Sequence, residues 1–191
     1  MNQWHCRRGA EVLHRGGVVA YPTESCFGLG CDPRNDVALS YLLWLKQRPT
    51  HKGLILIAAH FDQLEPYVLP TSVGTRQKLE RSWPGPFTWL LPANSNVSGL
   101  LTGEHNTLAV RVTAHPVAAA LCEQFGGAIV STSANLAGRP AAKTQLDLCR
   151  QFSRNLDYVV PGDLGTQSQP SEIRDALSDE LIRPGVNHAH P

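Results

Sequence analysis

Short apolar runs alternate along this chain with segments of helical pattern, and that alternation limits the folds it can adopt. The runs are bounded by Gly, Pro or polar residues, which is typical of buried strands. We predict strands at 18–22, 53–59, 87–93, 108–112, 128–135, 157–160, 171–177 and 180–184. We predict helices at 3–15, 38–46, 62–68, 71–82, 117–125 and 144–153, with Asp36 capping the second. Because several connections resemble hairpins, the sequence indicates an α/β fold with a mixed sheet rather than a purely parallel one.

Two segments between these elements are predicted to be irregular. The Gly-rich stretch CFGLGCDP at 26–33 is interpreted as a turn, and the polar stretch 94–106 as a loop. A length of 191 residues suits one domain, so we predict a single domain over 1–191, with a core at about 5–185 and a tail at 186–191.

Charge and hydropathy exclude several classes of protein. The formal net charge is +1, so no overall field draws the chain to nucleic acid or to an anionic membrane, and any basic site must be local. The N-terminal residues contain no apolar signal-peptide core, and no apolar run is long enough to span a membrane. We therefore expect a cytoplasmic protein.

The cysteines and histidines do not indicate a metal site. Five cysteines without a C-x-x-C pair predict neither a disulfide framework nor a metal centre, and the eight histidines show no H-x-x-x-H pattern. Cys26 and Cys31 are interpreted as small buried hydrophobic residues, because nothing in the sequence marks an activating base for either thiol.

A cluster of cations lies between two apolar segments, in the stretch LWLKQRPTHKG. Pro49 disfavours helical geometry at Arg48, and in an extended chain Lys46 and Arg48 would share a face and reach one anion together. An Arg fork combined with a Lys point charge suits a polyphosphate. The alternative is a helix C-terminus whose cations simply complement the helix dipole.

Three further segments place polar groups where a ligand can bind. Thr23 and Glu24 leave a predicted strand and enter the Gly-rich turn, where backbone can approach a ligand closely. Ser131 to Asn135 end a strand with four hydrogen-bonding side chains, but no G-x-S-x-G elbow is present, so a serine hydrolase is not indicated. Arg111 lies inside an apolar strand and needs either an internal carboxylate or an anionic ligand.

The order of these segments resembles the YrdC/TsaC family of threonylcarbamoyl-AMP synthases, in its short bacterial form. The resemblance runs from about residue 18 to residue 185 and rests on a series of motifs. They are YPTE (21–24), FGLG (27–30), KQRP (46–49), WPGPFT (83–88), AVR (109–111) with HP (115–116), STSAN (131–135) with Gly138, SEIRD (171–175) and IRPG (182–185). The resemblance implies one α/β domain whose twisted mixed sheet and flanking helices surround a large, basic, open cleft.

The resemblance also implies roles for individual residues. Lys46 and Arg48 would be catalytic in an electrostatic sense, by gripping the nucleotide phosphates. The residues implied to bind ATP are Lys46, Arg48, Thr50, Thr107, Asn135, Lys143 and Arg183. The residues implied to bind threonine are Thr23, Arg111, Ser133 and Ser171, with Arg111 on the substrate carboxylate.

The implied reaction condenses L-threonine, bicarbonate or CO2, and ATP to threonylcarbamoyl-adenylate and pyrophosphate. The expected cofactor is Mg2+ bound through the ATP phosphates, with no organic prosthetic group and no protein metal site. Partner proteins would then transfer the threonylcarbamoyl group to tRNA. The alternative function is an RNA-binding protein, for tRNA or rRNA maturation, that uses the same basic cleft without catalysis. The low net charge weighs against that alternative.

Overall fold

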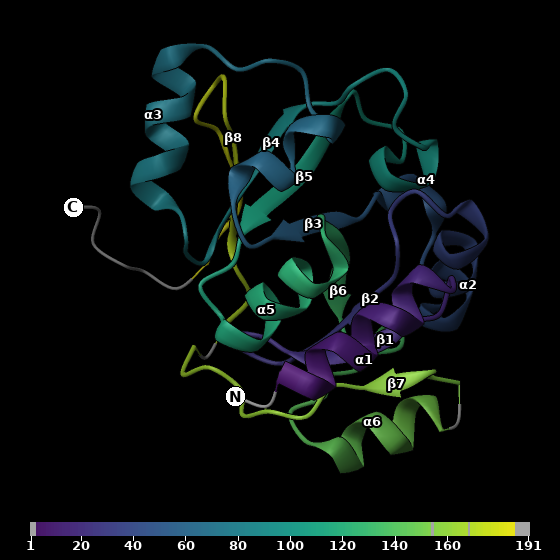
Figure 1. Cartoon of the computed structure of the whole chain (residues 1–191). Helices are drawn as coiled ribbons and strands as arrows, with labels where there is room; N and C mark the ends of the chain where they lie inside the picture. The colour runs from purple at the N-terminus through teal and green to yellow at the C-terminus, as the bar shows by residue number, and fades with distance from the viewer. Residues whose placement is uncertain (1–2, 154, 168, 186–191) are drawn as a thin grey trace.

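The nine strands found among the described residues form one mixed sheet, with helices on both of its faces (Figure 1). The structure is a computed structural model that describes residues 3–153, 155–167 and 169–185. The predicted tail at 186–191 lies outside these residues. The strands are β1 Val19–Pro22, β2 Phe27–Gly30, β3 Ile55–Ala58, β4 Phe87–Pro92, β5 Thr107–Val112, β6 Ile129–Ser133, β7 Tyr158–Val159, β8 Glu172–Asp175 and β9 Leu181–Arg183.

The strand order across the sheet is β7-β1-β2-β6-β3-β5-β4-β8-β9. The pairs β1–β7, β3–β5 and β4–β8 are parallel, and the other neighbours are antiparallel. The predicted α/β fold with a mixed sheet is therefore confirmed. This order places β6 between β2 and β3, so the polar end of β6 lies near the middle of the sheet.

Six α-helices and three short 3-10 helices connect the strands of the described chain. The α-helices are α1 Gln3–His14, α2 Asp36–Lys46, α3 Val73–Ser82, α4 Gly99–Thr102, α5 Pro116–Phe125 and α6 Gln145–Phe152. The 3-10 helices are η1 Thr50–Lys52, η2 Phe61–Gln63 and η3 Glu65–Tyr67. The ends of α5 follow their sequence signals, because Pro116 begins the helix and Gly126 ends it in a left-handed conformation.

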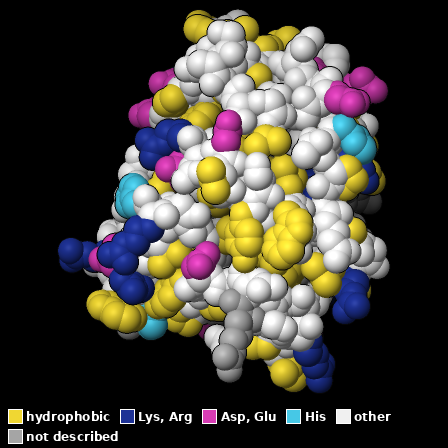
Figure 2. Space-filling model, turned by 90° about the vertical axis from the view of Figure 1, so that its right-hand side faces the viewer, with side chains coloured by type: hydrophobic (Ala, Val, Ile, Leu, Met, Phe, Trp, Pro, Cys, Tyr) yellow, Lys and Arg dark blue, Asp and Glu magenta, His cyan; other side chains and the backbone are white. Residues whose placement is uncertain are grey.

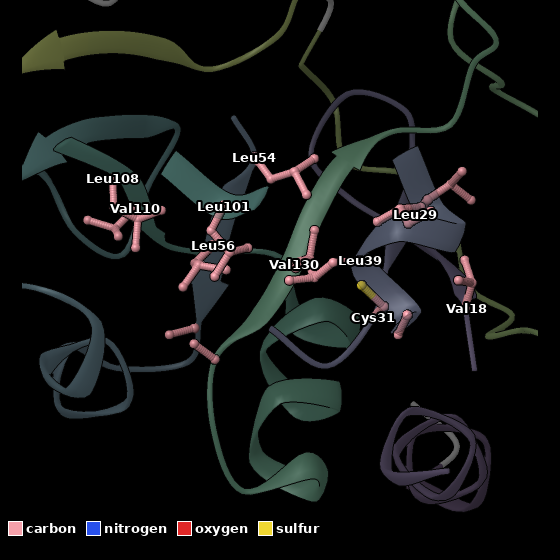
Figure 3. Packing of buried hydrophobic residues seen from close by; sticks show 14 of the residues in the cluster. Val18, Leu29, Cys31, Leu39, Leu54, Leu56, Leu101, Leu108, Val110 and Val130 are labelled. Carbon is pink, nitrogen blue, oxygen red and sulfur yellow. The ribbon is translucent and has the colours of Figure 1, made fainter. Parts of the chain in front are cut away.

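The sheet separates two clusters of buried side chains, as alternation along the strands requires. Ile57 and Ile129 point to the face covered by α1 and α5, whereas Leu56 and Val130 point to the opposite face. Figure 3 shows part of the second cluster, where Leu39 of α2 and Leu101 of α4 pack toward the sheet. Both faces of the central strands are therefore buried, which explains their unbroken apolar runs.

Four predicted features differ from the structure. The segment 26–33 contains strand β2, since its backbone pairs with both β1 and β6. The side chain of Asn35, not Asp36, caps α2 by accepting hydrogen bonds from Val37 N and Ala38 N. The predicted helix at 62–68 is instead the two 3-10 helices η2 and η3, and the predicted loop at 94–106 contains α4.

Candidate active site

On one face of the sheet, the apolar surface under α5 changes to a polar one. Ile57 is in register with both Arg111 on β5 and Ile129 on β6. Side chains in register share a face, so Arg111 lies beside this apolar pair. Two and four residues beyond Ile129, Ser131 and Ser133 point to the same face. The strands thus place one cation and two hydroxyl groups where the core ends.

A pocket of about 270 Å³ opens over this polar surface. Side chains from both ends of the sequence line it. It brings together seven of the predicted site residues, namely Thr23, Arg48, Arg111, Ser133, Asn135, Ser171 and Arg183. Ser25, Cys26, Gly28 and Ser131 also line it. Sequence reasoning gave Ser131 no role at the site, although its two-residue spacing from Ser133 places both on one face.

The pocket is strongly basic. Arg48, Arg111 and Arg183 all line it, and no carboxylate is present among the described lining residues. Burial lowers the pKa of Arg183, and the nearby charges of Arg111 and Arg48 lower that pKa further. Three guanidinium groups held this close repel one another, so an anionic ligand would stabilise the arrangement.

The predicted extended conformation of the KQRP segment is wrong. Helix α2 continues through Lys46, and Gln47 then turns the chain with a left-handed φ of 53°. The backbone N–H of Arg48 donates to Leu43 O at 2.9 Å, which closes the helix end. Lys46 and Arg48 therefore do not share a face of an extended strand. The turn sends Lys46 into the protein and Arg48 to the pocket wall.

Lys46 anchors the turn that follows β6. Its ammonium group donates to the backbone oxygen of Ser133, to Asn135 O at 2.8 Å and to Asn135 Oδ1 at 3.4 Å. Only 4% of the residue is exposed, and it is not among the residues that line the pocket. Burial, with a smaller contribution from the charge of Arg48, lowers the pKa of Lys46 to about 8. Lys46 thus holds Ser133 and Asn135 in place at the pocket edge.

Arg48 is held by the loop that follows it. Its Nε and Nη2 donate to Gly53 O at 3.1 and 2.9 Å. These bonds to a backbone oxygen orient the guanidinium without neutralising its charge. Arg48 therefore keeps its charge available to a ligand.

The sequence left open whether Arg111 pairs with an internal carboxylate or with an anionic ligand. The structure shows an internal carboxylate beside it. Arg111 Nη2 lies 3.3 Å from Oε2 of Glu24, and both residues are more than nine-tenths buried. Glu24 also accepts a hydrogen bond from Thr113 Oγ1 at 2.7 Å. Because Arg111 also lines the pocket, the two interpretations of this buried cation do not exclude each other.

Hydroxyl groups on opposite sides of the pocket are fixed by short hydrogen bonds. Thr23 Oγ1 donates to Cys26 O at 2.7 Å and closes the turn between β1 and β2. Ser171 Oγ lies 2.9 Å from Thr88 Oγ1, and Arg183 Nη2 donates to Ser171 O at 2.8 Å. Hydrogen bonds within the protein therefore position Thr23, Ser171 and Arg183.

Besides Lys46, three predicted site residues lie outside this pocket. Thr50 lines a second pocket of about 760 Å³, which also involves Arg48 and the exposed Trp44. Figure 2 shows the side of the molecule on which α2 lies, with hydrophobic side chains gathered near its centre. Thr107 begins β5, and Lys143 is exposed shortly before α6, but neither lines the first pocket. Their predicted contacts with ATP stay predictions.

The two cysteines noted in the sequence differ. Cys31 is fully buried in the core, as expected of a small hydrophobic residue. Cys26 instead lines the pocket, and burial raises the pKa of its thiol. A thiol with a raised pKa is a weak nucleophile at neutral pH, so Cys26 contributes to the pocket wall rather than to covalent chemistry.

Comparison with known proteins identifies the family. The Sua5/YciO/YrdC family model, described as "Telomere recombination", matches residues 11–185. The chain belongs to the Sua5/YciO/YrdC family. Its relatives include a "Threonylcarbamoyl-AMP synthase" of Nitrosococcus oceani, which is 54% identical over 180 residues, or 94% of this chain and 97% of the relative. A protein of the same name from Halorhodospira halophila is 51% identical over 93% of each chain.

Solved structures of the Sua5/YciO/YrdC family share the fold. P. abyssi Sua5 complexed with L-threonine matches with a TM-score of 0.90 at 31% identity. The match covers 97% of this chain but 55% of that one, so the chain spans just over half the length of the archaeal protein. E. coli YciO matches with a TM-score of 0.84 at 26% identity, over 98% of this chain and 92% of that one.

In the described part of this Sua5/YciO/YrdC chain, no helix is long and apolar enough to cross a membrane. The same residues contain no group of three or more His, Cys, Asp or Glu side chains that would hold a metal ion.

Proposed function

We propose that the chain is a threonylcarbamoyl-AMP synthase, an enzyme that joins L-threonine, CO2 or bicarbonate, and ATP into threonylcarbamoyl-adenylate with release of pyrophosphate. The observation that carries the proposal is the convergence of Arg48, Arg111 and Arg183 on one pocket. Relatives that match nearly the whole chain carry the name of this synthase. Because that name describes an enzyme, it does not favour the alternative of an RNA-binding protein without catalysis.

The pocket suits two anionic substrates that would otherwise repel each other. Arg111, on the β5 side, receives the carboxylate of threonine, and Thr23, Ser133 and Ser171 surround the amino acid. Arg48 and Arg183 face the nucleotide phosphates. Arginine suits both tasks because its planar fork matches carboxylate and phosphate oxygens.

The chemistry needs positioning more than acid–base catalysis. The amine of threonine adds to CO2 and loses a proton to solvent, which gives a carbamate. A carbamate oxygen attacks the α-phosphorus of ATP, a new P–O bond forms, and the bond from the α-phosphorus to the bridging oxygen breaks as pyrophosphate leaves. Arg48 and Arg183 offset the negative charge that builds on the leaving pyrophosphate.

The residues of the pocket fit Mg2+ that enters with ATP rather than a resident metal. Mg2+ prefers carboxylate, phosphate and water oxygens, and the described lining residues offer hydroxyls, an amide and guanidinium groups. The ion would lower the negative charge of the phosphates. The residues Arg48 and Arg183 would hold the same phosphates from the protein side.

The product is an activated carbamoyl group, which has to be passed on. We infer that partner proteins transfer it to tRNA, in the cytoplasm. This inference follows the resemblance of the chain to the synthase family.

Pyrophosphate release from the purified protein tests the proposal. The assay contains ATP and Mg2+, with or without L-threonine and with or without bicarbonate. We expect release only when both are added, with threonylcarbamoyl-adenylate detected by mass spectrometry. Pyrophosphate release that does not depend on threonine would indicate simple hydrolysis of ATP. No pyrophosphate release from folded protein would contradict the proposal.

A further inference from the structure

Glu24 lies behind the pocket, directly after the ligand-facing Thr23. Only 7% of the Glu24 residue is exposed, and its carboxylate oxygen Oε2 is buried. The residue lies two positions after the end of β1, in the turn of the hairpin that also fixes Thr23. Glu24 cannot reach a ligand without moving the hairpin, because the protein covers it.

The two oxygens of Glu24 have different partners. Oε1 accepts a hydrogen bond from Thr113 Oγ1 at 2.7 Å, and Oε2 lies 3.3 Å from Arg111 Nη2. Thr113 Oγ1 in turn accepts from the backbone N–H of His115 at 3.1 Å. The carboxylate is thus fixed on one side by β5 and the residues after it, and holds Arg111 on the other.

Glu24 is the polar partner of the Arg111 side chain among the described residues. Arg111 Nε and Glu24 Oε2 are both buried without a hydrogen-bond partner, so the 3.3 Å contact between the two side chains is an ion pair alone. A single contact therefore sets the orientation of this guanidinium. A buried arginine that loses its counter-ion is strongly destabilised, so its side chain is expected to change conformation.

The charges around the pocket increase the need for that contact. Arg48 and Arg183 line the same pocket and repel Arg111. Burial raises the pKa of Glu24, but the charge of Arg111 and the Thr113 hydrogen bond lower it by more, so its pKa lies below the usual range. The carboxylate is therefore ionised at neutral pH and offsets part of the positive charge.

We propose that Glu24 is a positioning residue that holds the Arg111 guanidinium from behind, so that its free N–H groups face the carboxylate of the amino-acid substrate. The inference rests on the proposed function, in which Arg111 receives that carboxylate. Glu24 itself touches no substrate. Its effect is specific to the amino-acid side of the pocket, because Arg48 is held separately by Gly53 O.

Three variants test this role in the full-length protein. Glu24→Gln removes the charge and keeps the shape, Glu24→Asp keeps the charge on a shorter side chain, and Thr113→Val removes the hydrogen bond that fixes Glu24. Glu80→Gln is the matched control, because Glu80 also pairs with an arginine, Arg76, but on the surface. KM for threonine, KM for ATP, kcat and melting temperature are measured for each.

We expect Glu24→Gln to raise KM for threonine on the order of 10- to 100-fold, the usual effect of misplacing a group that binds the ligand. KM for ATP should change by less than about 2-fold. Glu24→Asp should recover part of the loss, Thr113→Val should raise KM for threonine to a smaller extent, and Glu80→Gln should change nothing. Equal changes in both KM values, or none, would overturn the inference. If Glu24→Gln does not fold, the KM values of Thr113→Val for threonine and ATP provide the same test.

Calorimetric titration of the protein with threonine separates this inference from the proposed function. Wild-type protein that binds threonine but releases no pyrophosphate would contradict the proposed function, and the threonine affinities of the variants would still decide the role of Glu24. Affinity that is equal in wild type and Glu24→Gln would overturn the role of Glu24 alone. Wild-type protein that does not bind threonine would contradict both.

Discussion

The ammonium group of Lys46 lies 2.8 Å from the backbone oxygen of Asn135 and also donates to the backbone oxygen of Ser133. A side chain at the end of α2 therefore fixes the turn that carries two predicted ligand-binding residues. The cation and the turn are almost ninety residues apart in the sequence, and only the fold brings them together.

We expect Lys46→Met to fold and to lower adenylate formation by about 100-fold or more. Methionine fills similar space but leaves the Ser133 and Asn135 oxygens without their donor, so the turn loosens. Circular dichroism and the pyrophosphate assay provide the measurements, and Lys78→Met is the control, because Lys78 is not among the residues that line the pocket. Activity within about 10-fold of wild type would show that the turn holds its shape without Lys46.

The pKa of Lys46 gives a second, independent test. The sequence contains four lysines, so the side-chain signals of ¹³C-labelled lysine can be followed by NMR, and Lys46→Met assigns the signal. We expect that signal to titrate at about pH 8. The unfolded lysine titrates near pH 10.4, so between these values the unfolded chain binds more protons. The contribution of Lys46 to stability therefore rises as pH increases through this window. A Lys46 titration above pH 10 would contradict the expected cost of burial.

Arg48→Ala should nearly abolish adenylate formation while the fold remains. The side chain is half-buried and bonds only to backbone oxygens of its own loop, so its loss removes phosphate-facing charge more than packing. We expect kcat to fall by about 100-fold or more. Unfolding of the variant, seen by circular dichroism, would show instead that Arg48 has a structural role.

Arg111→Ala should raise the threonine requirement far more than the ATP requirement, because its guanidinium faces the amino-acid carboxylate in the proposed complex. The substitution also leaves Glu24 as an unpaired buried carboxylate, so we expect lower stability, by about 3 kcal/mol. Steady-state kinetics and thermal unfolding provide the two readouts. Equal increases in both KM values would contradict the carboxylate assignment.

Gly30→Ala should destabilise the sheet beside the pocket. A Cβ at this position would lie 2.5 Å from Val130 O and 2.9 Å from the ring of buried Tyr21, and neither has room to retreat. We expect a loss of at least about 2 kcal/mol in the free energy of unfolding. Gly99→Ala is the control, because its Cβ would have no atom within 4 Å. Equal melting temperatures for the two variants would contradict this close packing.

The sequence was sufficient for elements whose signals are local. The strands β3 to β6 follow from their apolar runs, and the ends of α5 from Pro116 and Gly126. Strand β2 was missed because two of its four residues are glycines, which are rare in strands. At Gly30 the small residue is needed because β6 and Tyr21 approach so closely.

Seven residues that line the candidate site were named from the sequence, but their contacts were not. Motif order indicated Arg48, Arg111 and Ser171, which the fold brings to one pocket. The partners of Lys46 and Arg111 depend on long-range packing, which no local pattern encodes. The end of the helix at Lys46 was predicted, but the turn after it was not, because Gln47 adopts the left-handed conformation without being a glycine.

The pocket takes Thr23 from the first hairpin of the described chain and Arg183 from the last. On the ribosome, the site therefore stays incomplete until Arg183 has been synthesised, so a nascent chain has its central strands before it can bind both substrates. Because β9 is an edge strand, its removal by a protease would take Arg183 from the pocket and leave the pairing of the central strands in place.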